Sequence, residues 1–184
     1  MALSSTIYKV ELQVSDLNRN YFNTHSFTVA QHPSETLERM LVRILVFAIN
    51  ANEQLEFTRG LSTAEVPDLW EKDPTGAIVH WIELGQPSMK RLNRACNHSP
   101  KVSVYTYAEN RARMWVQQNQ GDLAQQDRLQ IIHLPMEQLE QLIPTLTRSL
   151  SLQCTLQDEL IWFGNSQKSL EVMPETLLQH KGTP

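Results

Sequence analysis

Alternating hydrophobic and polar positions predict β-strands at both ends of the chain. In Thr6–Val14 every second residue is apolar, which is the pattern of a strand that buries one face. A turn-rich connection separates this run from Phe27 and Val29, so we predict a β-hairpin over about residues 5–31. Near the other end, three short apolar runs predict a β meander: Leu152–Leu156, Glu159–Phe163 and Leu170–Val172.

The longest helical pattern follows the first hairpin. Proline and serine at His32-Pro33-Ser34-Glu35 are typical of a helix start, with Ser34 as the N-cap. Apolar residues then recur every three or four positions, which predicts an amphipathic helix over 34–52: Leu37, Met40, Leu41, Ile44, Leu45 and Ala48. Further helices are predicted at 88–98, 110–118 and 136–146.

Ile78–Leu84 is the strongest strand signal inside the chain. It is apolar on both faces, as is typical of a central strand that is covered on both sides. Gly85 and Pro87 end it, and shorter strands are predicted at 54–59, 102–107 and 129–134. Strands that alternate with helices predict a mixed α/β sheet. We expect a single domain over 1–184, with a mobile tail from about 175.

Composition restricts the classes of partner and compartment. The chain has 184 residues, 41% of them hydrophobic, and a net charge of −4, which argues against broad non-specific affinity for nucleic acid or anionic membranes. A local basic site remains compatible with this charge. The sequence shows neither a signal-peptide pattern nor an apolar run near the roughly 20 residues needed to cross a bilayer. We therefore expect a cytoplasmic protein with no membrane partner, and two reduced thiols at Cys96 and Cys154.

Common catalytic motifs are absent from the sequence. There is no GxSxG nucleophile motif, no Walker A loop, no GxGxxG and no HExxH. These absences argue against several hydrolase, nucleotide-binding and zinc-enzyme classes. His80 and His133 lie inside apolar strand patterns, which is typical of core histidines with satisfied hydrogen bonds.

Three acids remain as candidates for chemistry: Glu38 in the first helix, Asp68 after Pro67, and Glu83 near the end of the central strand. The spacing from Asp68 to Glu83 suits two adjacent antiparallel strands joined by a turn at 73–76. Two carboxylates that converge from neighbouring strands can hold a hard divalent cation. The alternatives are a half-exposed Glu83 at a sheet end and a Glu38 paired with a nearby Lys or Arg.

Seven segments, taken in order, resemble the bacterial YaeQ family along nearly the whole chain. They are MALSSTIYKV, HPSETLERM, QLEFTRGLS, PDLW, WIELGQP, WVQQNQ and TLQDELIW. The resemblance implies a fold similar to the PD-(D/E)XK nucleases, with a mixed sheet and a restriction-endonuclease-like core in αβββαβ order. The N-terminal hairpin and the C-terminal meander would be additions to this core.

The resemblance also implies roles for the acids. Asp68 would be the metal ligand of the PD motif, and Glu83 the second ligand, with the backbone carbonyl of Leu84 as a third. Glu38 would correspond to the acid on the first helix of those nucleases and would assist through a water molecule. The expected cofactor is Mg²⁺ or Mn²⁺.

The sequence departs from the nuclease pattern at one position. Gly85 stands where the motif has its lysine. Lys90, at the start of the following helix, is our candidate to supply the amine, and Gln86 could position the attacking water. Lys72 is a weaker alternative.

Two functions follow from this interpretation. The first is a metal-dependent phosphodiesterase that acts on DNA or RNA, with arginines that contact phosphates: Arg39, Arg43, Arg91 and Arg94. The second is a non-catalytic module on a degenerate nuclease fold that binds nucleic acid or a protein.

Overall fold

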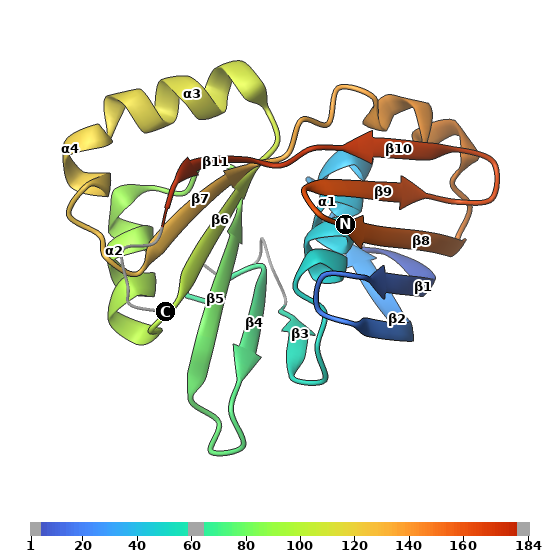
Figure 1. Cartoon of the computed structure of the whole chain (residues 1–184), viewed down its shortest axis with the longest axis horizontal. Coiled ribbons are helices and arrows are strands. Elements are labelled where there is room, and N and C mark those ends of the chain that lie inside the picture. Colours follow the sequence, from blue (N-terminus) through green and yellow to red (C-terminus); the bar gives the residue numbers. More distant parts are fainter. Residues whose placement is uncertain (1–4, 59–64, 180–184) are drawn as a thin grey trace. The chain divides into compact units, whose positions relative to one another are not determined.

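The computed structural model describes residues 5–58 and 65–179. The chain divides into two compact units (Figure 1). The first contains Met1–Ala51 and Met136–Met173, and the second contains Asn52–Pro135 and Pro174–Pro184. Each unit is built on its own mixed β-sheet, so the predicted α/β class is confirmed.

The first unit contains a five-stranded sheet in the order β10-β9-β8-β1-β2. The predicted hairpin is confirmed, because β1 and β2 pair antiparallel along their whole length. The predicted meander is confirmed as three successive antiparallel strands. The structure adds that β8 pairs with β1 in parallel, which joins the hairpin and the meander into one sheet. The strands are β1 (Thr6–Asp16), β2 (Tyr21–Gln31), β8 (Ser149–Gln157), β9 (Leu160–Gly164) and β10 (Ser169–Val172).

Helix α1 (Leu37–Ile49) lies in the same unit. Its Phe47 contacts Phe27 of β2, with ring centroids 5.1 Å apart. The N-cap is Thr36, whose hydroxyl accepts a hydrogen bond from the backbone N–H of Arg39, so the prediction of Ser34 is wrong by two residues. Ser34 instead contacts the side chain of His32.

The helix predicted over 136–146 is also wrong. The segment forms two short 3₁₀ helices, η2 (Leu139–Gln141) and η3 (Ile143–Thr145). Pro144 explains the difference, because it has no N–H to donate and its ring obstructs a continuous α-helix.

The second unit contains a six-stranded sheet in the order β11-β7-β6-β5-β4-β3. The central strands β5, β6 and β7 run parallel, and β3, β4 and β11 are added antiparallel. The strands are β3 (Leu55–Phe57), β4 (Leu69–Lys72), β5 (Ile78–Leu84), β6 (Val102–Thr106), β7 (Leu129–His133) and β11 (Glu175–Leu178).

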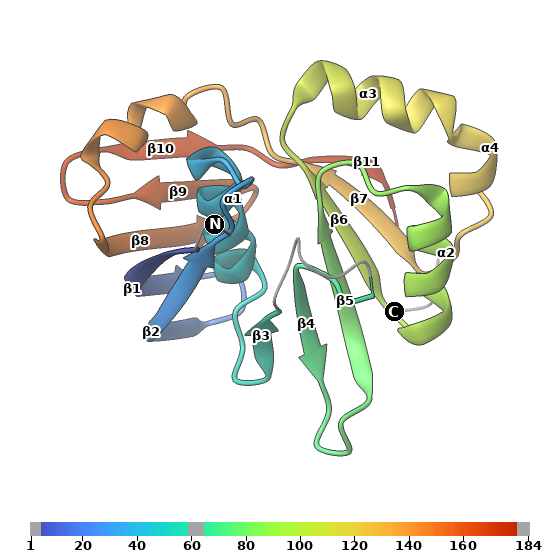
Figure 2. The ribbon, with the colours of Figure 1, turned by 180° about the vertical axis from the view of Figure 1, so that it is seen from behind.

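Three helices accompany this second sheet: α2 (Met89–His98), α3 (Glu109–Gln118) and α4 (Gln120–Leu123). Figures 1 and 2 show them beside β5, β6 and β7. The hydrophobic core on this side includes Trp81 and Val104 from the strands, and Leu92 and Leu123 from the helices. The face of β5 that carries Trp81 is therefore the face covered by helices, and by alternation Glu83 belongs to the same face.

The element order α1-β3-β4-β5-α2-β6 matches the predicted order of a helix, three strands, a helix and a strand. The pattern of residues 61–76 is typical of a loop, but β4 forms within this stretch because its backbone pairs with β5. Glu175–Leu178, within the predicted tail, forms β11 because it pairs with β7. The end of that tail, and Arg59 of the predicted strand 54–59, lie outside the described residues.

Two further expectations concern the cysteines and membrane-spanning helices. Cys96 and Cys154 are both buried and free, so the expectation of two thiols without a disulfide between them is confirmed. No helix within the described residues is long and apolar enough to span a membrane.

Candidate functional site

Asp68 directly precedes β4, and Glu83 lies on β5, so the prediction that two adjacent antiparallel strands bring these acids together is confirmed for the strands. Leu69 pairs with Ile82, and the backbone N–H of Asp68 donates to the carbonyl of Ile82 at 3.0 Å. The charge of Asp68 raises the pKa of Glu83, so the two carboxylates lie near each other.

A tight turn holds this pair of strands in register. The Asp73 carboxylate accepts hydrogen bonds from the backbone N–H groups of Thr75 and Ala77, at 2.8 and 3.0 Å. Gly76 has a φ of +86°, a conformation that glycine adopts without a steric penalty. The predicted turn at 73–76 is therefore confirmed, and its Asp and Gly are the residues that fix it.

Both acids are buried, with 3% of Asp68 and 2% of Glu83 exposed. A buried carboxylate is costly unless hydrogen bonds or charges compensate it. The Oδ2 atom of Asp68 accepts a hydrogen bond from the backbone N–H of Leu84 at 2.9 Å. Asp68 therefore contributes to the structure of the sheet, whatever else it does.

Glu83 receives two donors on a single oxygen. Its Oε1 atom accepts from Trp81 Nε1 and from Arg91 Nε, each at 2.7 Å. Burial is the main influence on the pKa of Glu83 and raises it above its ordinary value. The contacts with Trp81 and Arg91 lower this pKa, while the nearby charge of Asp68 raises it. The two acids therefore interact electrostatically, and the arginine offsets part of the cost.

The first turn of α2 brings Arg91 to this site. The hydroxyl of Ser88 caps the helix by accepting a hydrogen bond from the backbone N–H of Arg91. The guanidinium also donates through one NH2 group to the carbonyl of Val66 at 2.6 Å. Arg91 thus connects the segment before Asp68 with Glu83 on β5.

Arg91, and not Lys90, is the cation that contacts the acid pair. Lys90 is exposed on the adjacent helix position. Gln86 is half-buried after β5. The Nζ atom of Lys72 lies 3.7 Å from the centroid of the Trp70 ring, in a cation–π contact. The sequence signal that could have identified Arg91 is the Ser88 cap, which fixes where the helix begins and hence which side chain turns toward β5.

Glu38 lies in the other unit, half-buried in the first turn of α1. Its role beside Asp68 and Glu83 therefore stays a prediction. The same helix contains Arg39 and Arg43, which both pair with Glu35, at 2.9 and 2.8 Å.

The predicted phosphate-binding arginines differ in their accessibility. Arg43 is only 5% exposed, so it does not present the accessible charge that a phosphate contact requires. Arg94 is exposed, and its ion pair with Glu65 is long, at 3.6 Å.

The donor set at Asp68 and Glu83 suits a hard cation in type. Mg²⁺ is commonly held by one or two carboxylates and completes its coordination with water and phosphate oxygens. Within residues 5–58 and 65–179 there is no group of three or more His, Cys, Asp or Glu residues that could hold a metal ion. A metal at this site would therefore depend on the two acids, backbone oxygen and solvent, and Arg91 already contacts one of the required oxygens.

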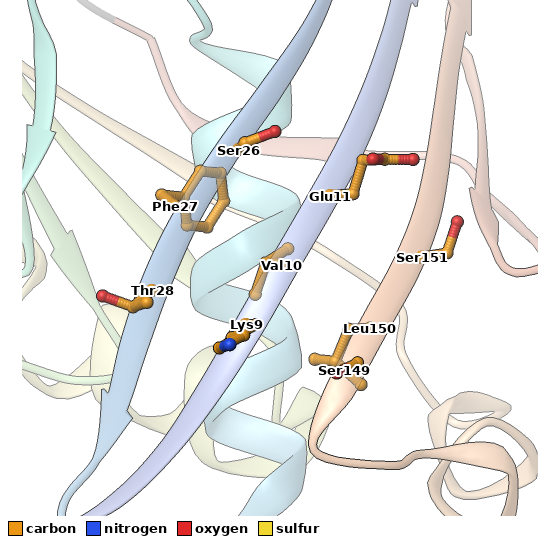
Figure 3. Close-up of a pocket in the computed structure, with 9 residues that line it drawn as sticks. All are labelled: Lys9, Val10, Glu11, Ser26, Phe27, Thr28, Ser149, Leu150 and Ser151. Carbon is orange, nitrogen blue, oxygen red and sulfur yellow. The ribbon is translucent and has the colours of Figure 1, made fainter.

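A separate shallow pocket of about 720 Å³ lies on the sheet of the first unit (Figure 3). Its polar lining comes from three adjacent strands: Lys9 and Glu11 of β1, Ser26 and Thr28 of β2, and Ser149 and Ser151 of β8. None of the predicted site residues lines it.

Comparison with known proteins gives consistent matches along the chain. The family model described as YaeQ protein matches residues 1–174. YaeQ of Escherichia coli (strain K12) is 42% identical over 172 residues, which is 94% of this chain and 95% of that protein. YaeQ of Salmonella typhi is 41% identical over the same shares.

Two crystal structures show a similar fold. YaeQ from Xanthomonas axonopodis pv. citri has a TM-score of 0.89 at 36% identity, covering 95% of this chain and 99% of that one. YaeQ from Pseudomonas syringae has a TM-score of 0.89 at 34% identity, covering 97% and 98%.

Proposed function

The chain belongs to the YaeQ family, and we propose that it is a divalent-metal-dependent phosphodiesterase that acts on nucleic acid. The observation that carries this proposal is that two buried acids meet at the end of β5: Glu83 lies on the strand, and Asp68 accepts from the backbone N–H of the next residue, Leu84. Burying two carboxylates side by side is unfavourable, and a divalent cation is one of the few ligands that would make it favourable.

The architecture supports the same proposal. The order α1-β3-β4-β5-α2-β6 corresponds to the αβββαβ order of a PD-(D/E)XK nuclease core. Strands β3, β4 and β5 are antiparallel neighbours, and β6 returns parallel to β5 after α2. We propose that β3, β4, β5, α2 and β6 of the second unit are the βββαβ part of a restriction-endonuclease-like core, with the hairpin and the meander as additions.

In this proposal Asp68 and Glu83 would hold Mg²⁺ or Mn²⁺, together with the carbonyl of Leu84. The metal would polarise a phosphate and lower the pKa of a bound water. Gln86 and Lys90 would orient that water or the phosphate.

The backbone offers a reason for the missing motif lysine. Gly85 has a φ of +86°, which is unfavourable for any residue with a Cβ atom. A lysine at this position would therefore strain the end of β5, so the positive charge must come from another element.

A second candidate function is a binding module for nucleic acid or protein. It is favoured by one observation, namely that the acids already have partners within the protein. Arg91 and Trp81 donate to Glu83, and the backbone of Leu84 donates to Asp68. A purely structural polar cluster would have the same contacts.

The test combines cleavage and metal binding. Purified protein is incubated with labelled single- and double-stranded DNA and RNA in Mg²⁺, Mn²⁺ or EDTA, and metal binding is measured by calorimetry. The phosphodiesterase predicts cleavage that EDTA stops and that Asp68→Asn and Glu83→Gln abolish. Glu71→Gln is the matched control, because Glu71 opposes His80 and therefore lies on the other face of the sheet from Glu83. Binding of nucleic acid without cleavage or metal uptake would favour the second function.

A further inference from the structure

We propose that Arg91 and a divalent cation compete for Glu83, so that Arg91 acts as a built-in latch on the candidate metal site. This inference rests on the proposed function, because it concerns how the same site would be loaded. It identifies Arg91 as a positioning residue that the motif itself does not contain.

The contact is direct and uses the carboxylate that a metal would need: a cation on Oε1 would compete with Arg91 for that oxygen, and a cation on Oε2 would lie beside the guanidinium. Arg91 Nε lies 2.7 Å from Glu83 Oε1, at the length of a strong charge-assisted hydrogen bond. Trp81 Nε1 donates to the same oxygen at 2.7 Å. Donor hydrogens cannot point at an oxygen lone pair that also coordinates a metal. A cation bound to Oε1 must therefore displace at least one of these donors.

The arginine is the partner that can move. Its side chain is 24% exposed, whereas that of Glu83 is 3% exposed. Trp81 is almost fully buried in the core between β5 and the helices, so its indole is held by packing. The guanidinium extends from the surface of α2 and is partly exposed, so it can move toward solvent.

The resting position of the latch is defined by a second contact. Arg91 also donates to the carbonyl of Val66 at 2.6 Å, just before Pro67 and Asp68. The guanidinium thus contacts both Glu83 and the segment that leads to Asp68. A divalent cation placed between the acids would repel it, and the repulsion is strong because the site is buried.

Displacement has a consequence for nucleic acid. A guanidinium that leaves Glu83 keeps its planar set of donors, which suits phosphate oxygens. Metal binding would therefore release a phosphate-binding group at the start of α2. By thermodynamic linkage, nucleic acid would in turn increase the affinity for metal.

The test measures metal affinity in four proteins by calorimetry with Mg²⁺ and Mn²⁺. Arg91→Gln removes the competing charge, and we expect it to bind metal about tenfold more tightly than the wild type. Arg91→Lys keeps a positive charge in the same turn, and we expect an affinity close to that of the wild type. Arg111→Gln removes an exposed positive charge from α3 in the same unit; it is the matched control and should leave the affinity unchanged.

The outcomes separate this inference from the proposed function. Equal affinities in the wild type and Arg91→Gln would overturn the latch and leave the metal site standing. If no variant binds metal, both the latch and the metal-dependent phosphodiesterase are overturned. Tighter binding in Arg91→Gln alone supports the latch.

A second measurement titrates the wild type, in case Arg91→Gln does not fold. The side-chain Nε–Hε signal of Arg91 is followed by ¹⁵N NMR during titration with Mg²⁺, with Arg91→Lys to assign it. The latch predicts that this signal shifts toward that of a solvated arginine as the site fills. A signal that stays unchanged at saturating Mg²⁺ would overturn the proposal.

Discussion

Asp68 accepts a hydrogen bond through Oδ2 from the backbone N–H of Leu84, over 2.9 Å. The bond joins the start of β4 to the end of β5, at the point where the regular pairing of the two strands stops. A candidate metal ligand is therefore also part of the framework that positions it. Substitutions of Asp68 will change stability as well as chemistry, and the two effects have to be separated.

Replacing Asp68 by Ala and by Asn separates them. Asp68→Ala leaves a buried N–H without its acceptor, and we expect a loss of about 1–3 kcal/mol in the free energy of unfolding. Asp68→Asn keeps an acceptor oxygen and should lose less, while it removes the charge that a metal requires. Urea unfolding followed by circular dichroism measures both. Equal losses in the free energy of unfolding of the two variants would mean that the hydrogen bond from Leu84 to Asp68 does not contribute to stability.

The positive φ of Gly85 predicts a backbone effect without a packing effect. A Cβ atom built at Gly85 meets no atom within 4 Å, so crowding does not contribute. Gly85→Ala should still lower the free energy of unfolding by about 1–2 kcal/mol, because of its left-handed conformation. Gly121→Ala, also uncrowded and in α4, is the control and should be neutral or stabilising. If Gly85→Ala leaves the free energy of unfolding unchanged, the positive φ of Gly85 does not disfavour a residue with a Cβ atom.

The burial of His80 predicts that the folded protein loses stability as the pH falls. It is buried and its Nε2 contacts Ser103 Oγ at 2.7 Å. Burial, and secondly the charge of Lys101, lower its pKa from 6.5 to about 3. The unfolded chain therefore binds a proton between these pH values that the folded chain does not. The stability that neutral His80 contributes is present above pH 6.5 and is lost as the pH falls toward 3.

Urea unfolding between pH 7 and pH 4 measures this loss. His80 should add a slope of about 1.4 kcal/mol per pH unit below its unfolded pKa. The slope should be smaller in His80→Gln and unchanged in His98→Gln, because His98 is exposed. Identical slopes in all three proteins would show that His80 is not the group responsible.

The buried ion pair in the first unit predicts a large loss of stability. Glu35 and Arg43 lie 2.8 Å apart, with side chains 2% and 6% exposed. Arg43→Met leaves a buried carboxylate without this partner and should cost about 3–5 kcal/mol. Adding Glu35→Leu in the same chain should recover part of the loss, since the uncompensated charge is then removed. Thermal melting of the single and double variants provides the measurement.

The candidate site was predicted from the sequence only in part. Proline before Asp68, and a carboxylate near the end of an apolar strand, identified two acids whose strands are in fact adjacent. The sequence did not indicate that Arg91 contacts Glu83, and the role of Lys90 as the missing motif amine stays a prediction. Successive helix residues point about 100° apart, so the precise start of α2 decides which of them turns toward Glu83. Buried partners such as Glu35 for Arg43 had no local signal either.

By itself the sequence determined the order and type of most elements, because turns, caps and the period of apolar residues act over a few positions. It also determined the Asp73–Gly76 turn, whose hydrogen bonds are local. Only the tertiary structure decided that β8 joins β1 to form a separate sheet, because that pairing connects residues far apart in the chain. The tertiary structure also decided that Arg91 contacts Glu83. Such a contact depends on side-chain direction and burial, which a short-range sequence pattern does not predict.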